Sequence, residues 1–270
     1  MTTGAPTAIY LFAGNSLTEG MYGESYVERM AEALYRGYAG FSGQAINIGR
    51  PAETVQSLLD RIDAPLHRYQ PQWVILAVGG NDVWQPWLGS RSLGWWLWLQ
   101  YKRAAQRQKP TTDLDQFGAA YRALIDRAQQ AGARVLACTA SPLGEQLNWP
   151  PNRRLARLNG IIKQVAADQH VPVADVWQAF VEELAVLPKP SRYAPGEWLL
   201  AWIDRGRMRI SSPDQIAARR HLYLTFDGIH LNSRGADLWA KTILLTLIQA
   251  QEQPLQPTLL HRIPNTEIST

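Results

Sequence analysis

Cysteine is nearly absent from this chain of 270 residues, and the single one, Cys138, excludes a disulfide within the chain. A chain of this length buries a substantial core without disulfides or metals. Cys138 lies in the apolar run 134–138, which favours a buried structural thiol over a nucleophile. This cysteine content is consistent with a reducing compartment.

Long hydrophobic runs are also lacking, since no apolar stretch reaches the roughly 18 residues that cross a bilayer. The N-terminus has no basic segment followed by an apolar one, as a secretion signal would have. We therefore expect a location that is cytoplasmic or peripheral to a membrane, and an exported protein with its signal removed stays an alternative. The net charge of +4 is mild and no arginine-rich motif is present, which argues against nucleic acid as a partner.

What the chain does contain is a regular alternation of short apolar segments with amphipathic ones. The apolar segments predict buried parallel strands at 8–13, 44–48, 73–78, 134–139 and 171–174. The amphipathic segments predict helices at 24–38, 54–68, 114–131, 154–168 and 234–250. The pattern predicts an α/β fold, a flavodoxin-like three-layer sandwich whose central parallel sheet of about five strands has helices on both faces.

Two tryptophan-rich segments, at about 83–110 and about 182–225, interrupt this alternation. We expect one domain over 1–251 that carries them as lid-like insertions, followed by an irregular tail over 252–270. Both insertions follow strand ends on the side of the sheet where ligands bind in such folds.

The first insertion holds five tryptophans and then a group of basic residues: Trp84, Trp87, Trp95, Trp96, Trp98, Lys102, Arg103, Arg107 and Lys109. Three interpretations stay open for it. It forms a cap that lines a substrate pocket or a carbohydrate platform, with Trp84, Trp87 and Trp95 as the candidate contacts. Alternatively, it makes a peripheral membrane contact or a dimer surface. The oligomeric state is left open.

Ser16 lies between the first predicted strand and a predicted helix start, in the run 14–20. A hydroxyl at that place faces unpaired backbone N–H groups, which suits a nucleophile whose attack creates an oxyanion. A helix cap is the simpler interpretation of the same residue. A nucleophilic serine also needs a base, and His230 has a carboxylate, Asp227, three positions before it on a glycine turn.

Two further strand ends provide candidate donors for an oxyanion. Gly49 follows the second predicted strand, where a missing Cβ allows close approach to the backbone N–H. Asn81 follows the third strand and carries an amide at its tip. Because parallel strands end at one edge of a sheet, we expect Ser16, Gly49, Asn81 and His230 to meet there.

These motifs, spread from about residue 8 to about residue 245, resemble the four blocks of the SGNH hydrolases, or GDSL esterase/lipase superfamily. Their order matches: Gly14-Asn15-Ser16-Leu17, then Gly49, then Gly79-Gly80-Asn81-Asp82, then Asp227-Gly228-Ile229-His230. The resemblance implies that Ser16 is the nucleophile, His230 the general base and Asp227 its orienting acid. It also implies an oxyanion hole made by the N–H groups of Ser16 and Gly49 and the side chain of Asn81, with no metal or other cofactor.

Asn15 departs from this pattern, since the family usually has aspartate before the serine. An amide still caps the turn, but it removes a negative charge near His230. We expect a serine esterase or lipase that cleaves acyl or acetyl esters of lipids or sugars through an acyl-enzyme. An acyltransferase with the same site is one alternative. A non-catalytic membrane- or glycan-binding module on the same scaffold is another, and acyl chain length is left open.

Overall fold

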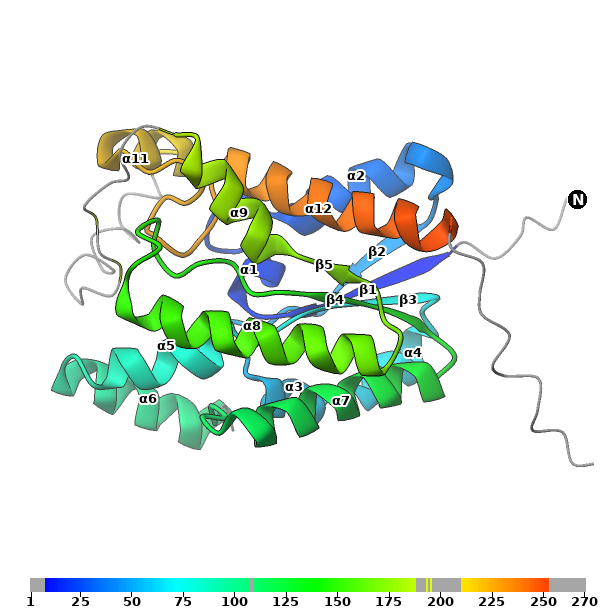
Figure 1. The fold of residues 1–270 in the computed structure, drawn as a ribbon, viewed down its shortest axis with the longest axis horizontal. Coiled ribbons are helices and arrows are strands. Elements are labelled where there is room, and N and C mark those ends of the chain that lie inside the picture. The colour runs from blue at the N-terminus through cyan, green and yellow to red at the C-terminus, as the bar shows by residue number, and fades with distance from the viewer. Residues whose placement is uncertain (1–7, 107–108, 188–192, 194, 196–209, 253–270) are drawn as a thin grey trace, which may run out of the picture.

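The computed structural model describes residues 8–106, 109–187, 193, 195 and 210–252. Its centre is a parallel sheet of five strands in the order β2-β1-β3-β4-β5 (Figure 1). The strands are β1 Ile9–Gly14, β2 Gln44–Asn47, β3 Trp73–Ala77, β4 Arg134–Cys138 and β5 Val173–Ala174. The five predicted strands and the flavodoxin-like order are therefore confirmed.

Helices cover both faces of the sheet, as Figure 1 shows. One face carries α2 Tyr26–Tyr35, α9 Val176–Ala185 and α12 Ser233–Glu252. The other carries α3 Val55–Leu59, α4 Asp63–Tyr69, α7 Leu114–Gln130 and α8 Pro150–Asp168. Shorter helical segments are α1 Ser16–Glu19, the 3-10 turn η1 Tyr38–Gly40 and α11 Pro213–Arg220.

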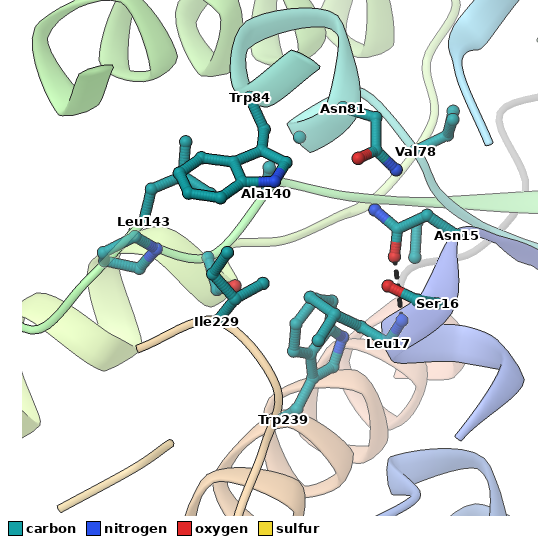
Figure 2. Close-up of a pocket in the computed structure, with 14 residues that line it drawn as sticks. Asn15, Ser16, Leu17, Val78, Asn81, Trp84, Ala140, Leu143, Ile229 and Trp239 are labelled. Carbon is teal, nitrogen blue, oxygen red and sulfur yellow. Dashed lines mark hydrogen bonds between the residues drawn. The ribbon is translucent and has the colours of Figure 1, made fainter. Parts of the chain in front are cut away.

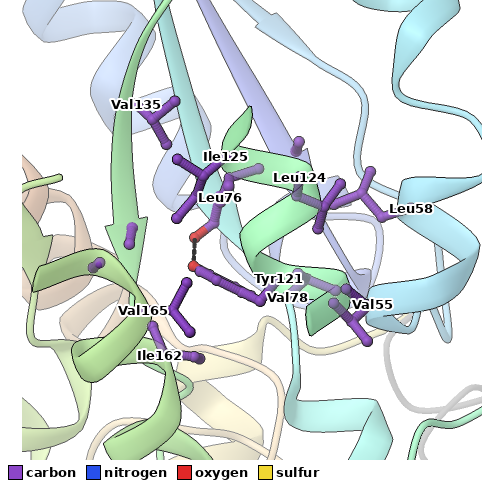
Figure 3. Packing of buried hydrophobic residues seen from close by; sticks show 14 of the residues in the cluster. Val55, Leu58, Leu76, Val78, Tyr121, Leu124, Ile125, Val135, Ile162 and Val165 are labelled. Atoms are coloured by element: carbon purple, nitrogen blue, oxygen red, sulfur yellow. Dashed lines mark hydrogen bonds between the residues drawn. The ribbon is translucent and has the colours of Figure 1, made fainter. Parts of the chain in front are cut away.

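Two hydrophobic clusters form the core, and the strands contribute alternate residues to each because side chains point to opposite faces. Leu11 of β1 and Leu76 of β3 pack with α3, α4, α7 and α8. Phe12 and Ile75 pack with α2, α9 and α12. Figure 3 shows the first cluster, in which the ring of Tyr121 from α7 lies between the sheet and α8. Burial on both faces explains why β1 and β3 are almost continuously apolar.

Cys138 lies in the second cluster and is fully buried. Burial raises the pKa of its thiol to about 12. The thiol is therefore protonated and shielded, which is the structural role expected for it.

The first of the two segments expected as lid-like insertions has regular secondary structure. The segment 83–110 is largely helical, since it contains most of α5 Gly80–Gly89 and all of α6 Leu93–Gln106. The predicted helix 54–68 is two helices, α3 and α4, and α9 was not predicted. Most of 182–225 between α9 and α11, and the tail after Glu252, lie outside the described residues.

Among the described helices, none combines the length and apolarity needed to traverse a bilayer.

The exposed side of α6 is apolar. Leu93, Trp96, Leu97 and Tyr101 are all exposed there. Trp95 and Trp98 contact each other edge to face, with ring centroids 5.7 Å apart. Helix α6 packs on α5, so the first insertion extends the layer that holds α7 and α8 (Figure 1).

Glu145, in the loop after β4, holds the segment that leads to Asp227 and His230. Its buried carboxylate accepts hydrogen bonds from the N–H groups of Tyr223 (2.8 Å), Leu224 (2.8 Å) and Thr225 (2.9 Å). The Thr225 hydroxyl donates a further bond to it at 2.8 Å. One carboxylate thus satisfies three consecutive backbone donors that would otherwise be unpaired.

We predict that Glu145→Ala lowers the free energy of unfolding by roughly 3 kcal/mol or more, because each buried donor left without an acceptor costs about 1–3 kcal/mol. Urea denaturation followed by circular dichroism measures the change. Glu182→Ala is the matched control, since Glu182 is exposed on α9 and accepts a bond from the Gln178 side chain. Equal losses in the two variants would contradict the prediction.

Candidate active site

Ser16 is the first residue of α1, directly beyond the carboxyl end of β1. Asn15 caps the helix, because its Oδ1 accepts a hydrogen bond from the Leu17 N–H at 3.0 Å. A Cβ on Gly14 would lie 2.2 Å from Thr18 Oγ1 and 2.4 Å from the Ala77 carbonyl, so glycine alone fits there. The chain therefore turns sharply at the strand end and presents the serine at the helix N-terminus.

His230 and Asp227 lie next to this serine, although 214 positions separate Ser16 from His230. The distance between His230 Nε2 and Ser16 Oγ is 3.1 Å. On the other side of the ring, His230 Nδ1 lies 2.7 Å from Asp227 Oδ2. Asp227 Oδ1 also accepts bonds from the N–H groups of Ile229 (2.9 Å) and His230 (2.7 Å). The carboxylate is thus held in place by the turn that carries the histidine.

The charges around His230 favour its protonated form more than water does. Burial alone would lower the pKa of the imidazole, but the charge and hydrogen bond of Asp227 and the charge of Glu19 raise it above its ordinary value. Burial would raise the pKa of Asp227, whereas His230 and the two backbone N–H groups lower it below its ordinary value. Asp227 is therefore ionised at neutral pH and stabilises a positive imidazolium.

Two aromatic rings pack against the imidazole of His230. The Tyr22 ring is tilted against it at a centroid distance of 5.5 Å, and the Phe226 ring is stacked on it at 6.1 Å. Tyr22 is half-buried and Phe226 is fully buried. The packing restricts rotation of the ring, so its orientation rests on more than the bond to Asp227. Neither residue was predicted to belong to the site, since neither stands in a recognisable sequence pattern with His230.

Asn81, at the start of α5, reaches the same edge of the sheet. Its Nδ2 donates one hydrogen bond to the Glu53 carbonyl at 3.0 Å. A primary amide has two N–H hydrogens, so the second stays available to a bound group. Asn81 also lines the pocket beside Ser16 (Figure 2).

Gly49 lies close to α1, the helix that begins at Ser16, but its N–H already has a hydrogen-bond acceptor. It donates to Asn47 Oδ1 at 2.9 Å. A Cβ at this position would lie 2.4 Å from the Glu19 backbone nitrogen, so the glycine is needed for packing against α1. A close approach of a ligand was predicted at Gly49, and the group that approaches it in the structure is the backbone of Glu19.

Ala52, in the same loop, has a left-handed conformation with φ 62°. Its carbonyl accepts a bond from Gln85 Nε2 at 2.8 Å, and its N–H has no acceptor in the described part of the chain. Ala52 was not predicted from the sequence, because a left-handed conformation can be expected in advance only where the residue is glycine.

A small pocket lies beside Ser16, with a volume of about 30 Å³. Figure 2 shows Trp84 from α5 and Ile229 from the turn before His230 on one side of it, and Asn15, Ser16 and Asn81 on the other. Further wall residues come from the loop after β4: Ala140, Ser141, Pro142 and Leu143. The walls are largely apolar, with the polar groups gathered around Ser16.

The three predicted substrate-contacting tryptophans have different positions. Trp84 lines the pocket, and Trp87 stacks on Trp84 with ring centroids 5.1 Å apart. Trp87 also contacts Trp149 edge to face at 4.6 Å. Trp95, on α6, contacts Trp98 and is not among the residues that line the pocket. Trp149 was not predicted, since it lies outside both insertions.

Comparison with known proteins identifies relatives of this chain. Residues 12–198 match the model of the GDSL-like lipase/acylhydrolase family. The acetylxylan esterase of Geobacillus stearothermophilus is 24% identical over 189 residues, which cover 66% of this chain and 80% of that enzyme.

Solved structures of similar proteins share the fold. A variant of the Geobacillus esterase matches with a TM-score of 0.63 and 19% identity, covering 92% of this chain and 96% of that one. That variant and two others of the same enzyme, described as catalytic mutants, replace a serine, a histidine and an aspartate. LAE5, an alpha/beta hydrolase from the metagenome of Lake Arreo, matches with a TM-score of 0.60 and 18% identity, covering 90% and 95%.

The family match spans more than half of the chain and includes the segments that carry Ser16, Gly49 and Asn81. The protein is therefore a carboxylic ester hydrolase that belongs to the GDSL-like lipase/acylhydrolase family.

Proposed function

We propose that the protein hydrolyses acetyl and other short acyl esters, with Ser16 as nucleophile, His230 as general base and Asp227 as the residue that orients it. The observation that carries this proposal is the hydrogen-bonded series Ser16–His230–Asp227, with distances of 3.1 and 2.7 Å. A serine hydroxyl is a weak nucleophile unless a base within hydrogen-bond reach accepts its proton.

In the first half of the reaction, Ser16 Oγ attacks the ester carbonyl carbon while His230 Nε2 accepts the hydroxyl proton. The tetrahedral intermediate then breaks its bond to the alcohol oxygen, and His230 returns the proton to that oxygen. An acyl group stays on Ser16. In the second half, water attacks this acyl-enzyme with His230 again as the base, which releases the carboxylic acid and restores Ser16.

The oxyanion of each intermediate needs donors that are already in place. The Ser16 N–H lies at the N-terminus of α1, where helical N–H groups have no intrahelical acceptor. The free N–H of the Asn81 amide is the second donor. Gly49, the third predicted donor, must exchange its bond to Asn47 for one to the oxyanion, whereas the Ala52 N–H of the same loop needs no exchange.

The relatives support the same assignment. In the Geobacillus esterase, the aspartate and the histidine replaced in the catalytic mutants are three positions apart, as Asp227 and His230 are here. Its activity on acetylated xylan, given by its name, supports acetylated carbohydrates as the substrate class of this protein. The pocket beside Ser16 agrees with this, because it is small and its walls are largely apolar, as a short acyl group requires.

We predict that Ser16→Ala lowers kcat for p-nitrophenyl acetate by about 10³-fold or more, since loss of the nucleophile leaves only donor and binding contributions. Initial rates measured at saturating ester give the value. Ser90→Ala is the control, because Ser90 is exposed at the end of α5. A Ser16→Ala protein that keeps a tenth of the parent rate would overturn the proposal.

The pH dependence follows from the charges around His230. The base must be neutral to accept the serine proton, so activity is lost as pH falls through its pKa. Since that pKa is raised, the acid limb of kcat/KM has its midpoint above 6.5. Glu19→Gln removes a charge that raises the pKa and moves the midpoint to lower pH, whereas Glu32→Gln, on the exposed side of α2, leaves it in place. A midpoint that does not move in Glu19→Gln contradicts this.

The pocket predicts a strong preference for short acyl groups. We expect kcat/KM to be at least about tenfold higher for p-nitrophenyl acetate than for the octanoate, because the added methylenes do not fit a small pocket. Trp84→Ala opens the wall beside Ser16 and narrows this ratio. Trp96→Ala, at an exposed position of α6, leaves the ratio unchanged. An octanoate rate equal to the acetate rate in the parent protein would exclude the pocket as the acyl site.

A further inference from the structure

The loop 48–53, between β2 and α3, supports Asn81 through a single backbone atom. The Glu53 carbonyl accepts the bond from Asn81 Nδ2 at 3.0 Å. That bond determines how the amide is rotated, and hence where its second N–H points. A shift of the Glu53 backbone would therefore move the donor on which the intermediate depends.

Arg61, just beyond α3, holds this loop at both ends. One Nη2 hydrogen bond goes to the Ile48 carbonyl at 2.6 Å. The Nε of the same guanidinium donates to Glu53 Oε2 at 2.7 Å, and Nη2 pairs with that oxygen as well. The other carboxylate oxygen of Glu53 accepts a bond from the Ser57 hydroxyl at 2.6 Å. Arg61 thus connects the start of the loop to its end.

Burial makes these contacts rigid. The side chain of Glu53 is 1% exposed and that of Arg61 is 14% exposed. So little water reaches this pair that breaking it would leave an uncompensated buried charge. The planar guanidinium donates in two directions at once, which a lysine ammonium on a flexible stem does not reproduce.

We propose that Arg61 is a positioning residue for ester hydrolysis, which fixes the Glu53 carbonyl and through it aims the Asn81 amide at the oxyanion. This inference rests on the proposed function, in which Asn81 is an oxyanion donor. Arg61 itself does not touch the substrate. Its contribution is to the transition state, where the oxyanion carries full charge, more than to the bound ester.

The test is Arg61→Lys, which keeps the positive charge beside Glu53 and so protects the fold. We expect kcat for p-nitrophenyl acetate to fall about tenfold or more while KM stays within about twofold, because one displaced donor affects the transition state first. Arg127→Lys is the matched control. Arg127 also bridges a backbone carbonyl and a carboxylate, those of Leu59 (2.9 Å) and Asp63 (2.8 Å), and its kcat should not change.

A double-mutant cycle separates positioning from general stability. We expect Asn81→Ala to lower kcat about 10²–10³-fold, as loss of one oxyanion donor does. If Arg61 acts through Asn81, Arg61→Lys then causes less than about a threefold further loss in the Asn81→Ala protein. Circular dichroism and thermal unfolding confirm that the variants are folded.

Other outcomes contradict either the role of Arg61 or the role of Asn81 as an oxyanion donor. A kcat for Arg61→Lys within twofold of the parent, or an equal loss in both backgrounds, contradicts the role of Arg61 and leaves the proposed function intact. An Asn81→Ala protein with full kcat removes Asn81 from the oxyanion hole and the role of Arg61 with it. In that case the Ser16→Ala result still decides whether the serine mechanism holds.

Discussion

The position of β1 between β2 and β3 is the constraint on which the whole site depends. Parallel pairing on both sides makes the three carboxyl ends neighbours, so residues that follow them meet without any long connection. Ser16 follows β1, the loop 48–53 follows β2, and Asn81 follows β3. The pairing is close enough that Gly14 admits no side chain between Thr18 and the Ala77 carbonyl. A wider spacing between β1 and β3 would move Ser16 away from Asn81, the candidate oxyanion donor.

Buried carboxylates in this protein differ in charge state according to what surrounds them. Asp227 is buried, yet its pKa is below the ordinary value because His230 and two backbone N–H groups outweigh the cost of desolvation. Asp82 also accepts two backbone N–H bonds, from Val55 and Thr111, but burial prevails and raises its pKa to about 7. The difference is a cationic partner. Asp227 thus keeps its negative charge beside the imidazolium. Asp82, which only connects two loops, is partly protonated near neutral pH.

Local patterns in the sequence predicted the strands and the residues around Ser16, because each rests on a signal within a few positions. Asp227 and His230 stand three apart on one turn, and the apolar strand segments are continuous. What local patterns could not show are contacts between distant segments. Glu145 satisfies N–H groups about 80 positions away, and the engagement of the Gly49 N–H depends on how the Asn47 side chain rotates. The division of 54–68 into two helices and the helical insertion at α6 depend on packing that periodicity does not reveal.

Two separate networks support the two tasks of the site. The Glu145 network holds the segment 223–225, which leads to Asp227 and His230, and so supports proton transfer by His230. The Arg61 network holds the loop 48–53 and Asn81, and so supports the oxyanion. The contacts described for these networks share no residue, and the tasks meet only at Ser16, which provides the nucleophilic oxygen and a donor N–H. Ser16 needs little support of its own, because the end of β1 and the cap by Asn15 already determine where α1 begins. The supporting hydrogen bonds are therefore concentrated on His230 and Asn81, the groups that come to Ser16 from distant parts of the chain.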